Sequence, residues 1–530
     1  MDPVNERITS SFDVFQDLVR TSQAFLTEGQ WTAAAAYAQI AAHYASVHHS
    51  GIFASRTLER ILGQIGQVVR PVPQKGQTVR DYKAAPRNIL HVLTEAFSTG
   101  GHTRFVWRWI AQDVDRCHSV ALTRQGDRNV PEALRGAVQS AGGRIHFLDR
   151  RPGGVLSRAH RLRVLASAFD HIVLHIHPHD VVPILAFSRK GSGPPVTLLN
   201  HADHLFWLGV SVADQVANIR ESGASLCQDR RGLARDKCIL LPIPLHANTS
   251  RITRGEARKL LGLSENTLVL LSIAAAHKYM ATDCPHFVDA LLPVLQGHPN
   301  AVLLVVGPEE SKEWAEGVRR AQGRIKVLGK REDINVFYEA ADVYLDSFPV
   351  GSLTSLLDAG VRGIPLVSYC PHPQARVLCC DDPALSEAQI RVGDVNEFRE
   401  RIGELLENCE HRLRQGELTK NSVLAVHDGK GWGAFVQDLY LRASHPHAVS
   451  EEQEGSDVPQ ASELDTLLAR VYDSAGLARG VPAIVRSHVG LLPFGVRTGL
   501  WRSMFGRDWR SFPGCILPDW IKTELKLLRR

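Results

Sequence analysis

The sequence predicts an α/β protein with two parallel sheets in tandem and helical additions at both ends, and three observations lead to this prediction. The 530 residues are 44% hydrophobic and 22% charged, which suits a soluble chain with more than one globular core. Short β-rich runs alternate with helical stretches, as in a doubly wound sheet with right-handed crossovers. This alternation stops near Pro242–Arg254 and then begins again, so we expect two Rossmann-like domains.

The first domain is expected over residues 87–250 and the second over residues 255–443. The first series of β-rich runs is Ile89–Leu93, Ser119–Leu122, Ile145–Leu148, Ile172–Ile176, Val196–Leu199 and Ile239–Leu241. The second series is Leu268–Ile273, Val302–Val306, Ile325–Leu328, Val343–Leu345 and Leu366–Ser368. Amphipathic helices are expected after the second series, at Val395–Asn408, His411–Val426 and Trp432–Arg442.

Residues 1–70 are expected to be helical. Trp31–Ser50 is rich in alanine with apolar residues at helical spacing, and a second helix at Ala54–Val68 would pair with it. No repeat follows, so this hairpin is a cap or dimerisation element in preference to a peptide-binding solenoid. Pro71–Pro86 has the composition of a linker.

The C-terminal part begins with an acidic linker at residues 445–462 and continues as a helical, basic and aromatic segment at residues 463–530. Aromatic and cationic side chains alternate over Arg486–Trp520, a pattern that can lie on an anionic membrane surface. We favour the alternative, in which these aromatic rings pack back against the domains.

Composition excludes several classes of protein. The net charge of +5 is too small for this length to indicate a nucleic-acid partner. Met1–Arg20 has no apolar signal region, and the longest apolar stretches, such as Thr267–Ala276, are too short to span a bilayer. Nine cysteines without a CxxC pair favour reduced thiols and a cytoplasmic location, with peripheral contact at the inner face of a membrane as an open alternative.

Ligands of parallel sheets bind at the carboxyl ends of strands, so the loops that follow the strands are the candidate sites. After the first strand, Gly100 and Gly101 would let the backbone approach a ligand just before His102, although many tight turns also contain a glycine pair. After the fourth strand of the second domain, Thr354 and Ser355 would begin a helix, where hydroxyl groups and free N–H groups bind phosphate.

Asp358 lies one turn further along that helix, where its carboxylate could accept hydrogen bonds from a sugar diol. The run Asp346–Pro365 resembles the nucleotide-binding segment of GT-B glycosyltransferases, closest to the O-GlcNAc transferase type and related bacterial enzymes. The resemblance implies that Thr354 and Ser355 bind the donor diphosphate and that Asp358 binds the ribose. Related retaining enzymes carry a glutamate where this sequence has Val350. The valine therefore favours an inverting mechanism.

The resemblance extends over residues 88–443. Lys278 follows the first strand of the second domain, where GT-B enzymes place a diphosphate-binding lysine, and an ammonium there would stabilise the leaving phosphate. Leu328 and Gly329 match the place where the backbone of the family meets the base of the nucleotide. The resemblance implies a nucleotide-sugar donor, with UDP favoured, and no cofactor or metal.

Histidines gather in the loops of the first domain. His177 follows one strand and His201 and His204 follow another, so they would face the cleft, and a neutral imidazole can take a proton from an acceptor hydroxyl. His201, anchored by the aromatic residues after it, leads His102 as the candidate base, and His177 and His204 are placed on the acceptor side. Their spacings also occur in zinc sites, to which Asp180 and Asp203 could contribute, but we expect no metal.

The function predicted from these residues is hexosyl or N-acetylhexosaminyl transfer from a nucleotide sugar to a hydroxyl or amide, inverting and metal-independent. The acceptor would be a protein, a lipid-linked molecule or a glycan, and a homo-oligomer is compatible with the pattern. A non-hydrolysing sugar-nucleotide epimerase and a non-catalytic scaffold of the same fold are the alternatives.

Overall fold

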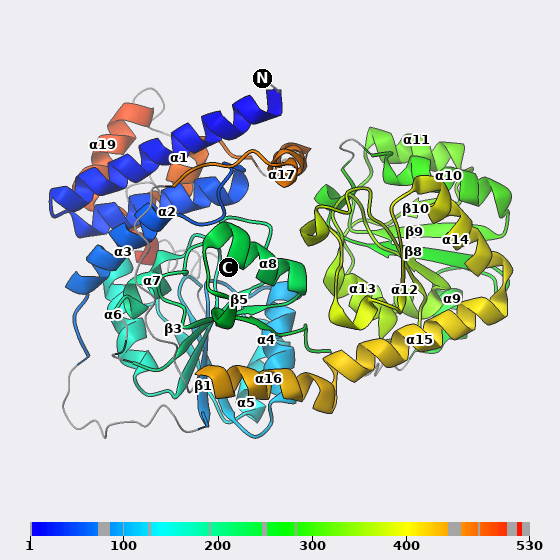
Figure 1. The fold of residues 1–530 in the computed structure, drawn as a ribbon, viewed down its shortest axis with the longest axis horizontal. Helices are drawn as coiled ribbons and strands as arrows, with labels where there is room; N and C mark the ends of the chain where they lie inside the picture. Colours follow the sequence, from blue (N-terminus) through cyan, green and yellow to red (C-terminus); the bar gives the residue numbers. More distant parts are fainter. Residues whose placement is uncertain are drawn as a thin grey trace.

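Two parallel sheets, each covered by helices, make up the body of the protein, as the sequence predicts (Figure 1). The computed structural model describes residues 3–72, 85–98, 100–125, 129–189, 191, 193–245, 252–280, 284–443, 457–474, 478–505 and 517–521. The expected linker at 71–86 and the acidic stretch at 445–462 therefore lie largely outside the described residues. In the described part, no helix is long and apolar enough to cross a membrane.

The first sheet has seven strands in the order β3-β2-β1-β4-β5-β6-β7, with all neighbours parallel. The strands are β1 Asn88–Leu93, β2 Cys117–Leu122, β3 Ile145–Phe147, β4 His171–His175, β5 Val196–Asn200, β6 Gln215–Asn218 and β7 Cys238–Leu240. Its helices are α4 Gly101–Gln112, α5 Glu132–Ser140, α6 Val155–Ala166, α7 Val181–Phe187 and α8 Glu221–Arg231. The sequence does not predict β6, which is short and polar.

The second sheet has six parallel strands and repeats the order of the first, β10-β9-β8-β11-β12-β13. Its strands are β8 Leu268–Ile273, β9 Ala301–Val306, β10 Ile325–Val327, β11 Val343–Leu345, β12 Leu366–Tyr369 and β13 Gln389–Val392, the last one not predicted. Its helices are α9 Arg254–Leu260, α10 Phe287–Gly297, α11 Lys312–Arg320, α12 Ile334–Ala340, α13 Leu353–Gly360 and α14 Val395–Glu407.

Two helices after the second sheet return the chain to the first domain. α15 spans Cys409–His427, and α16, at Gly429–Ala443, lies under the first sheet (Figure 1). Trp432 of α16 donates from its indole N–H to the Pro242 carbonyl at 2.8 Å, and Tyr440 donates to Asp113 at 2.8 Å. Side chains of both domains and of α16 share one apolar core, so the return fixes the domains against each other.

The helical cap consists of α1, α2, α3, α17, α18 and α19, which come from the two ends of the chain and lie together (Figure 1). The helices are α1 Pro3–Thr27, α2 Trp31–Val47, α3 Arg56–Val68, α17 Glu463–Ser474, α18 Val481–His488 and α19 Phe494–Phe505. Buried alanines of α2, such as Ala35 and Ala38, allow close helix approach, and α1 and α18 both pack on α2. The sequence predicts that α2 pairs with α3, but in the structure the main partner of α2 is α1.

α17 and α18 pack within the helical cap, but neither helix carries the aromatic rings of Arg486–Trp520, so the packing of those rings stays a prediction. Leu468 of α17 and Ile484 of α18 are fully buried, whereas Phe494 at the start of α19 is 62% exposed. Trp509 and Phe512, which belong to the same basic and aromatic pattern, lie outside the described residues.

Candidate active site

Two helix N-termini, one from each domain, meet at the interface of the domains. α4 begins at Gly101, directly after Gly100, whose φ of +97° is open to glycine without strain. A Cβ atom on Gly101 would lie 2.5 Å from Oγ1 of Thr354, in the first turn of α13, so this close approach requires glycine. The positive ends of both helix dipoles therefore point at one place, as in sites that bind anions.

Asp358 forms ion pairs across the same interface. Its carboxylate accepts hydrogen bonds from Arg104 at 2.7 Å and from Arg108 at 2.9 Å, and its side chain is 7% exposed. The two arginines stand four residues apart on α4 and so share one face of that helix. Neither arginine is predicted from the sequence, although their spacing of four residues directly after the glycine pair is a usable signal. The predicted role of Asp358 toward ribose stays a prediction.

Lys278 lies behind the start of α13, on the 3₁₀ turn Ala276–Tyr279 that follows β8. Its ammonium donates to the Gly351 carbonyl at 2.7 Å, and burial lowers its pKa, with Cys380 and Asp346 acting in the opposite direction. The buried Asp346 accepts from the backbone N–H groups of Ser347 at 2.9 Å and Ser352 at 2.8 Å. These contacts fix the loop that leads into α13.

The predicted base-binding residues lie elsewhere in the second domain. Leu328 and Gly329 follow β10, which is separated from β11 by β9 and β8. Gly329 has a φ of +62°, and its carbonyl accepts from Gly307 N at 2.7 Å. Among the described residues, no interaction joins Leu328 or Gly329 to Thr354, Ser355 or Asp358. The role of Leu328 and Gly329 toward a base stays a prediction.

His102 and His201 stack on each other in the first domain, with ring centroids 4.1 Å apart and planes inclined by 29°. His102 is the second residue of α4, and His201 directly follows β5. Burial lowers the pKa of His201 to about 4 and that of His102 well below its usual value, so both imidazoles are neutral at pH 7. Nε2 of His102 is buried and finds no hydrogen-bond partner among the described residues.

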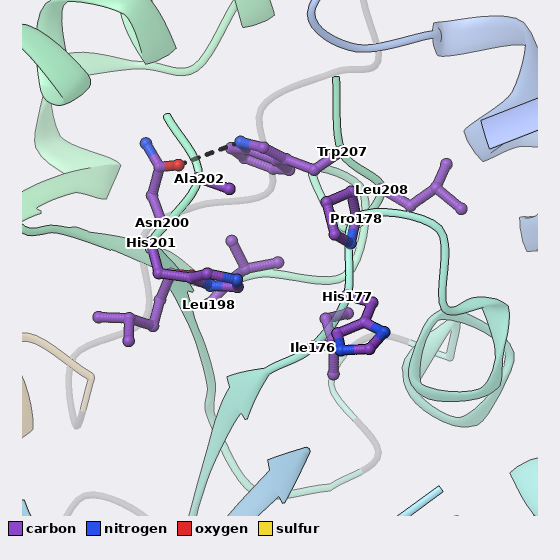
Figure 2. Close-up of a pocket in the computed structure, with 10 residues that line it drawn as sticks. Ile176, His177, Pro178, Leu198, Asn200, His201, Ala202, Trp207 and Leu208 are labelled. Carbon is purple, nitrogen blue, oxygen red and sulfur yellow. Dashed lines mark hydrogen bonds between the residues drawn. The ribbon is translucent and has the colours of Figure 1, made fainter. Parts of the chain in front are cut away.

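A small pocket opens beside this stack, between the loops that follow β4 and β5 (Figure 2). His177 and His201 line it together with Asn200 and Trp207, and the Trp207 indole donates to the Asn200 amide oxygen at 3.1 Å. Trp207 is 4% exposed, so it anchors the segment after His201, as the sequence analysis expects. The pocket thus gathers two of the predicted histidines.

His204 lies further along the same loop, next to a buried ion pair. Its Nδ1 is 3.3 Å from the carboxylate of Asp203, which accepts from Arg220 at 2.6 and 2.8 Å. Arg220 also donates to the Cys379 carbonyl of the second domain at 2.7 Å. Asp203 and Arg220, like the arginines of α4, therefore join the two domains.

A hydrogen-bonded row of histidines runs through the first sheet beneath the site. His91 is 2.9 Å from His175 and 3.0 Å from His118, ring nitrogen to ring nitrogen, and all three are buried. His118 also contacts Asp113. The row ends at His175, whose ring lies 6.4 Å from that of His102. A sequence shows which side chains of one strand share a face, because these alternate along the strand. It does not show which histidines of neighbouring strands lie side by side, so this row could not be predicted.

Comparisons with known proteins agree with this architecture. The family model described as "Glycosyl transferases group 1" matches residues 268–408, in the second domain. HepE of Anabaena in complex with UDP-glucose is 16% identical, with a TM-score of 0.51, and the match covers 66% of this chain and 99% of that one. A glycosyltransferase from Rickettsia africae is 10% identical, with a TM-score of 0.52, covering 67% of this chain and 98% of that one. No curated protein sequence matches the chain.

A mutant of the Thermobaculum terrenum O-GlcNAc transferase is 15% identical, with a TM-score of 0.50, and the match covers 82% of each chain. The chain has the GT-B fold. The resemblance to GT-B glycosyltransferases that the sequence predicts is therefore confirmed, and residues 268–408 match the family model described as "Glycosyl transferases group 1".

Proposed function

We propose that this GT-B protein transfers a sugar from a nucleoside diphosphate sugar to an acceptor hydroxyl or amide. The observation that carries the proposal is the meeting of the α4 and α13 N-termini at Gly101 and Thr354. Two helix dipoles and the hydroxyls of Thr354 and Ser355 make a site for a diphosphate, and Lys278 lies behind it. The family match covers α13, and HepE in the UDP-glucose complex has a similar fold.

The ion pairs of Asp358 give a physical account of donor binding. The ribose would replace Arg104 and Arg108 on the Asp358 carboxylate, and the two freed guanidinium groups would turn to the diphosphate. Nη1 of Arg108 is buried and has no hydrogen-bond partner among the described residues, so one donor is already available for this role. Donor binding would thereby exchange one set of contacts between the domains for another.

The acceptor would enter on the side of the first domain. We propose that the stacked pair His102 and His201 takes its proton, with His177 and His204 beside the acceptor. Imidazoles with such low pKa values are weak bases in the free protein, but a bound diphosphate raises the pKa of a nearby imidazole and so improves the base. UDP is the favoured nucleotide.

Inversion and independence from metal ions are further parts of the proposal. Val350 stands at the position of the glutamate in related retaining enzymes, so no carboxylate is present there. Its side chain packs in an apolar cluster with Phe53, which lies between α2 and α3, and with Leu226 of α8. Lys278, Arg104 and Arg108 supply positive charge near the diphosphate site, which is the electrostatic task that a metal performs in other transferases.

The first test is binding of UDP and GDP, measured by titration calorimetry on the full chain. We expect UDP to bind and the double variant Thr354→Val/Ser355→Ala to lose about tenfold or more in affinity, because two hydroxyl donors are removed. Ser311→Ala, which alters the N-cap of α11 in the same domain, is the matched control and should bind as the wild type does. Binding of neither nucleotide would overturn the proposal and favour a scaffold.

A second test separates the enzymatic alternatives. The chain is incubated with a panel of UDP and GDP sugars, with and without glycan, peptide and lipid-linked acceptors, and the nucleotide and sugar products are analysed. Transfer predicts release of nucleoside diphosphate that increases with one class of acceptor. An epimerase would interconvert the donor sugar without any dependence on an acceptor.

A further inference from the structure

Three histidines from distant parts of the chain meet where the helical cap joins the first domain. His43 lies on α2, His179 follows β4, and His488 ends α18. One ring nitrogen from each lies within 4.8 Å of the others, the one such group of potential metal ligands found among the described residues. His43 and His179 stack with centroids 4.3 Å apart, and His43 Nδ1 lies 2.7 Å from His488 Nε2.

From this geometry we propose that His43, His179 and His488 bind a divalent transition metal ion that clips the cap to the first domain. Ligand sets made only of imidazole suit Zn²⁺, Co²⁺, Ni²⁺ and Cu²⁺ and not Mg²⁺ or Ca²⁺. The site adjoins the acceptor side of the proposed active site, since the rings of His179 and His177 lie 5.8 Å apart, and its role is structural. It holds α2, α18 and the loop that carries His177 in one place.

The positions of the nitrogens fit such an ion after a small adjustment. Zn–N bonds of about 2.0–2.1 Å at tetrahedral angles place ligand nitrogens about 3.3 Å apart. The 2.7 Å contact between His43 and His488 is a hydrogen bond, so binding would displace its proton and separate the two rings by roughly 0.6 Å. All three ligand nitrogens lie within 4.8 Å of one another, so closing the longest gap to about 3.3 Å needs a movement of at most about 1.5 Å. Burial keeps the three rings neutral, as metal ligands must be.

Partner atoms of the histidines support binding. Nδ1 of His179 is buried and has no hydrogen-bond partner among the described residues. The Gln39 amide lies 3.0 Å from His488 Nδ1, so its oxygen, after a flip of the amide, would accept the N–H of a ligating His488. A ring nitrogen without a partner is typical of a metal ligand. So is a ring whose other nitrogen is hydrogen-bonded to an amide.

The fourth ligand would be water. A small cavity beside His179 is lined by Gln39, Thr94, Thr123 and Arg124, among others, and gives a solvent molecule polar partners. Asp180 is not a candidate, because its carboxylate already accepts hydrogen bonds from Thr94, Thr123 and the Val182 N–H. Arg124 lowers the pKa values of all three rings through its charge, so it opposes a cation and should keep the affinity moderate.

The test uses the tag-free full chain, stripped with EDTA and titrated with Co²⁺ and then Zn²⁺. We expect the intense visible absorption of tetrahedral Co²⁺, its loss when Zn²⁺ competes, and about one Zn²⁺ retained per chain at equilibrium in dialysis against buffer that contains Zn²⁺. Zn²⁺ should also raise Tm in a concentration-dependent way, whereas Mg²⁺ should not. A chain that retains no Zn²⁺, or gives only weak octahedral Co²⁺ absorption, overturns the proposal.

Substitutions locate the ion. His43→Gln and His488→Gln should each weaken Zn²⁺ binding by about tenfold or more, because each removes a ligand. His411→Gln, on α15 of the second domain, is the control and should bind as the wild type does. Undiminished binding in both ligand variants would place the metal elsewhere and overturn the assignment. If a ligand variant fails to fold, the Co²⁺ spectrum of the wild type still decides whether the site exists.

Discussion

The two Rossmann-like domains share a strand order but differ in the polar groups that their sheets bury. The first sheet buries His91, His118, His171 and His175 within its strands, all at 0% exposure. The second has mainly apolar strands and keeps its charged groups, Asp346 and Lys278, just beyond their carboxyl ends. One strand order thus supports a neutral, imidazole-rich half and a charged half, which suits hydroxyl chemistry on one side and a diphosphate on the other.

Hydrogen-bond partners explain why the buried histidines are neutral in one place and charged in another. Each ring nitrogen of His91 faces a nitrogen of another imidazole, His175 or His118. One proton is enough for each of these hydrogen bonds, so neutral rings can make both. His427, at the end of α15, instead faces two oxygen acceptors, the Ile243 carbonyl at 2.7 Å and the Asp382 carboxylate at 2.8 Å. Two acceptors require two N–H groups, and therefore an imidazolium.

The largest expected effect is destabilisation of the first domain by acid. Burial lowers the pKa of His171 and of His175 to about 3 and that of His91 well below its usual value. The unfolded chain binds these protons and the folded chain does not, so the free energy of unfolding falls as pH drops from about 6.5 toward 3. At pH 5 His171 and His175 each cost about 2 kcal/mol, and His91 acts in the same direction.

Urea unfolding at pH 7.5 and pH 5 measures the change, and hydrogen exchange locates it. We expect strands β1 and β4 to lose protection at pH 5 before β8 and β9 do. His171→Met removes one titrating group and should reduce the pH dependence by about 2 kcal/mol. Equal loss of protection in the two domains would mean that the buried histidines do not distinguish them.

The next effect concerns the charged half. Lys278→Ala should lower kcat by roughly 100-fold or more while changing KM less, because a fixed ammonium acts most strongly on the leaving diphosphate. Steady-state kinetics with the donor found in the sugar panel separate the two quantities. Lys259→Ala, an exposed residue of α9 in the same domain, is the control. Turnover near that of the wild type at saturating donor would remove Lys278 from the leaving-group role.

A smaller effect is expected at the boundary between the halves. Asp358→Ala should weaken UDP binding roughly 10- to 100-fold, since a buried carboxylate loses its hydrogen bonds to the ribose. The double variant Arg104→Met/Arg108→Met breaks the same ion pairs but keeps the carboxylate. If this variant reproduces the loss of affinity for uridine, which carries no phosphate for the two arginines to bind, Asp358 acts by joining the domains and not by binding ribose. Calorimetry on both variants gives the answer.

The sequence allowed most of the fold to be predicted, because buried parallel strands are short apolar runs. It did not reveal β6, Gln215–Asn218, whose polar end residues find most of their partners on other elements. The Gln215 amide donates to Thr197 on the neighbouring strand and to the Leu439 carbonyl of α16. Tertiary contacts thus override a weak local signal. α1, in contrast, carries apolar residues such as Ile8, Phe15, Leu18 and Val19 at helical spacing, so its pattern was available.

The candidate site could be predicted only where it lies close to a motif. Thr354, Asp358 and Lys278 follow strands, and the loop after a strand is readable in a sequence. The pairing of Arg104 with Asp358, or of His43 with His488, joins residues hundreds of positions apart, and no local pattern specifies which partner a charged or imidazole side chain meets. Topology decides these pairs, so they need the structure.

The smallest expected effect tests the opposite protonation of His427. Its pKa is raised, because attraction to Asp382 and the two hydrogen bonds outweigh burial, which acts in the other direction. A raised pKa contributes stability below about pH 6.5 that is lost as pH rises through the pKa of the folded state. His427→Gln should therefore cost more free energy of unfolding at pH 6 than at pH 8, measured by urea unfolding. The matched variant His171→Met should show the reverse dependence, because that ring is neutral when folded. If both variants depend on pH with the same sign, the two domains do not differ in the protonation of their buried histidines.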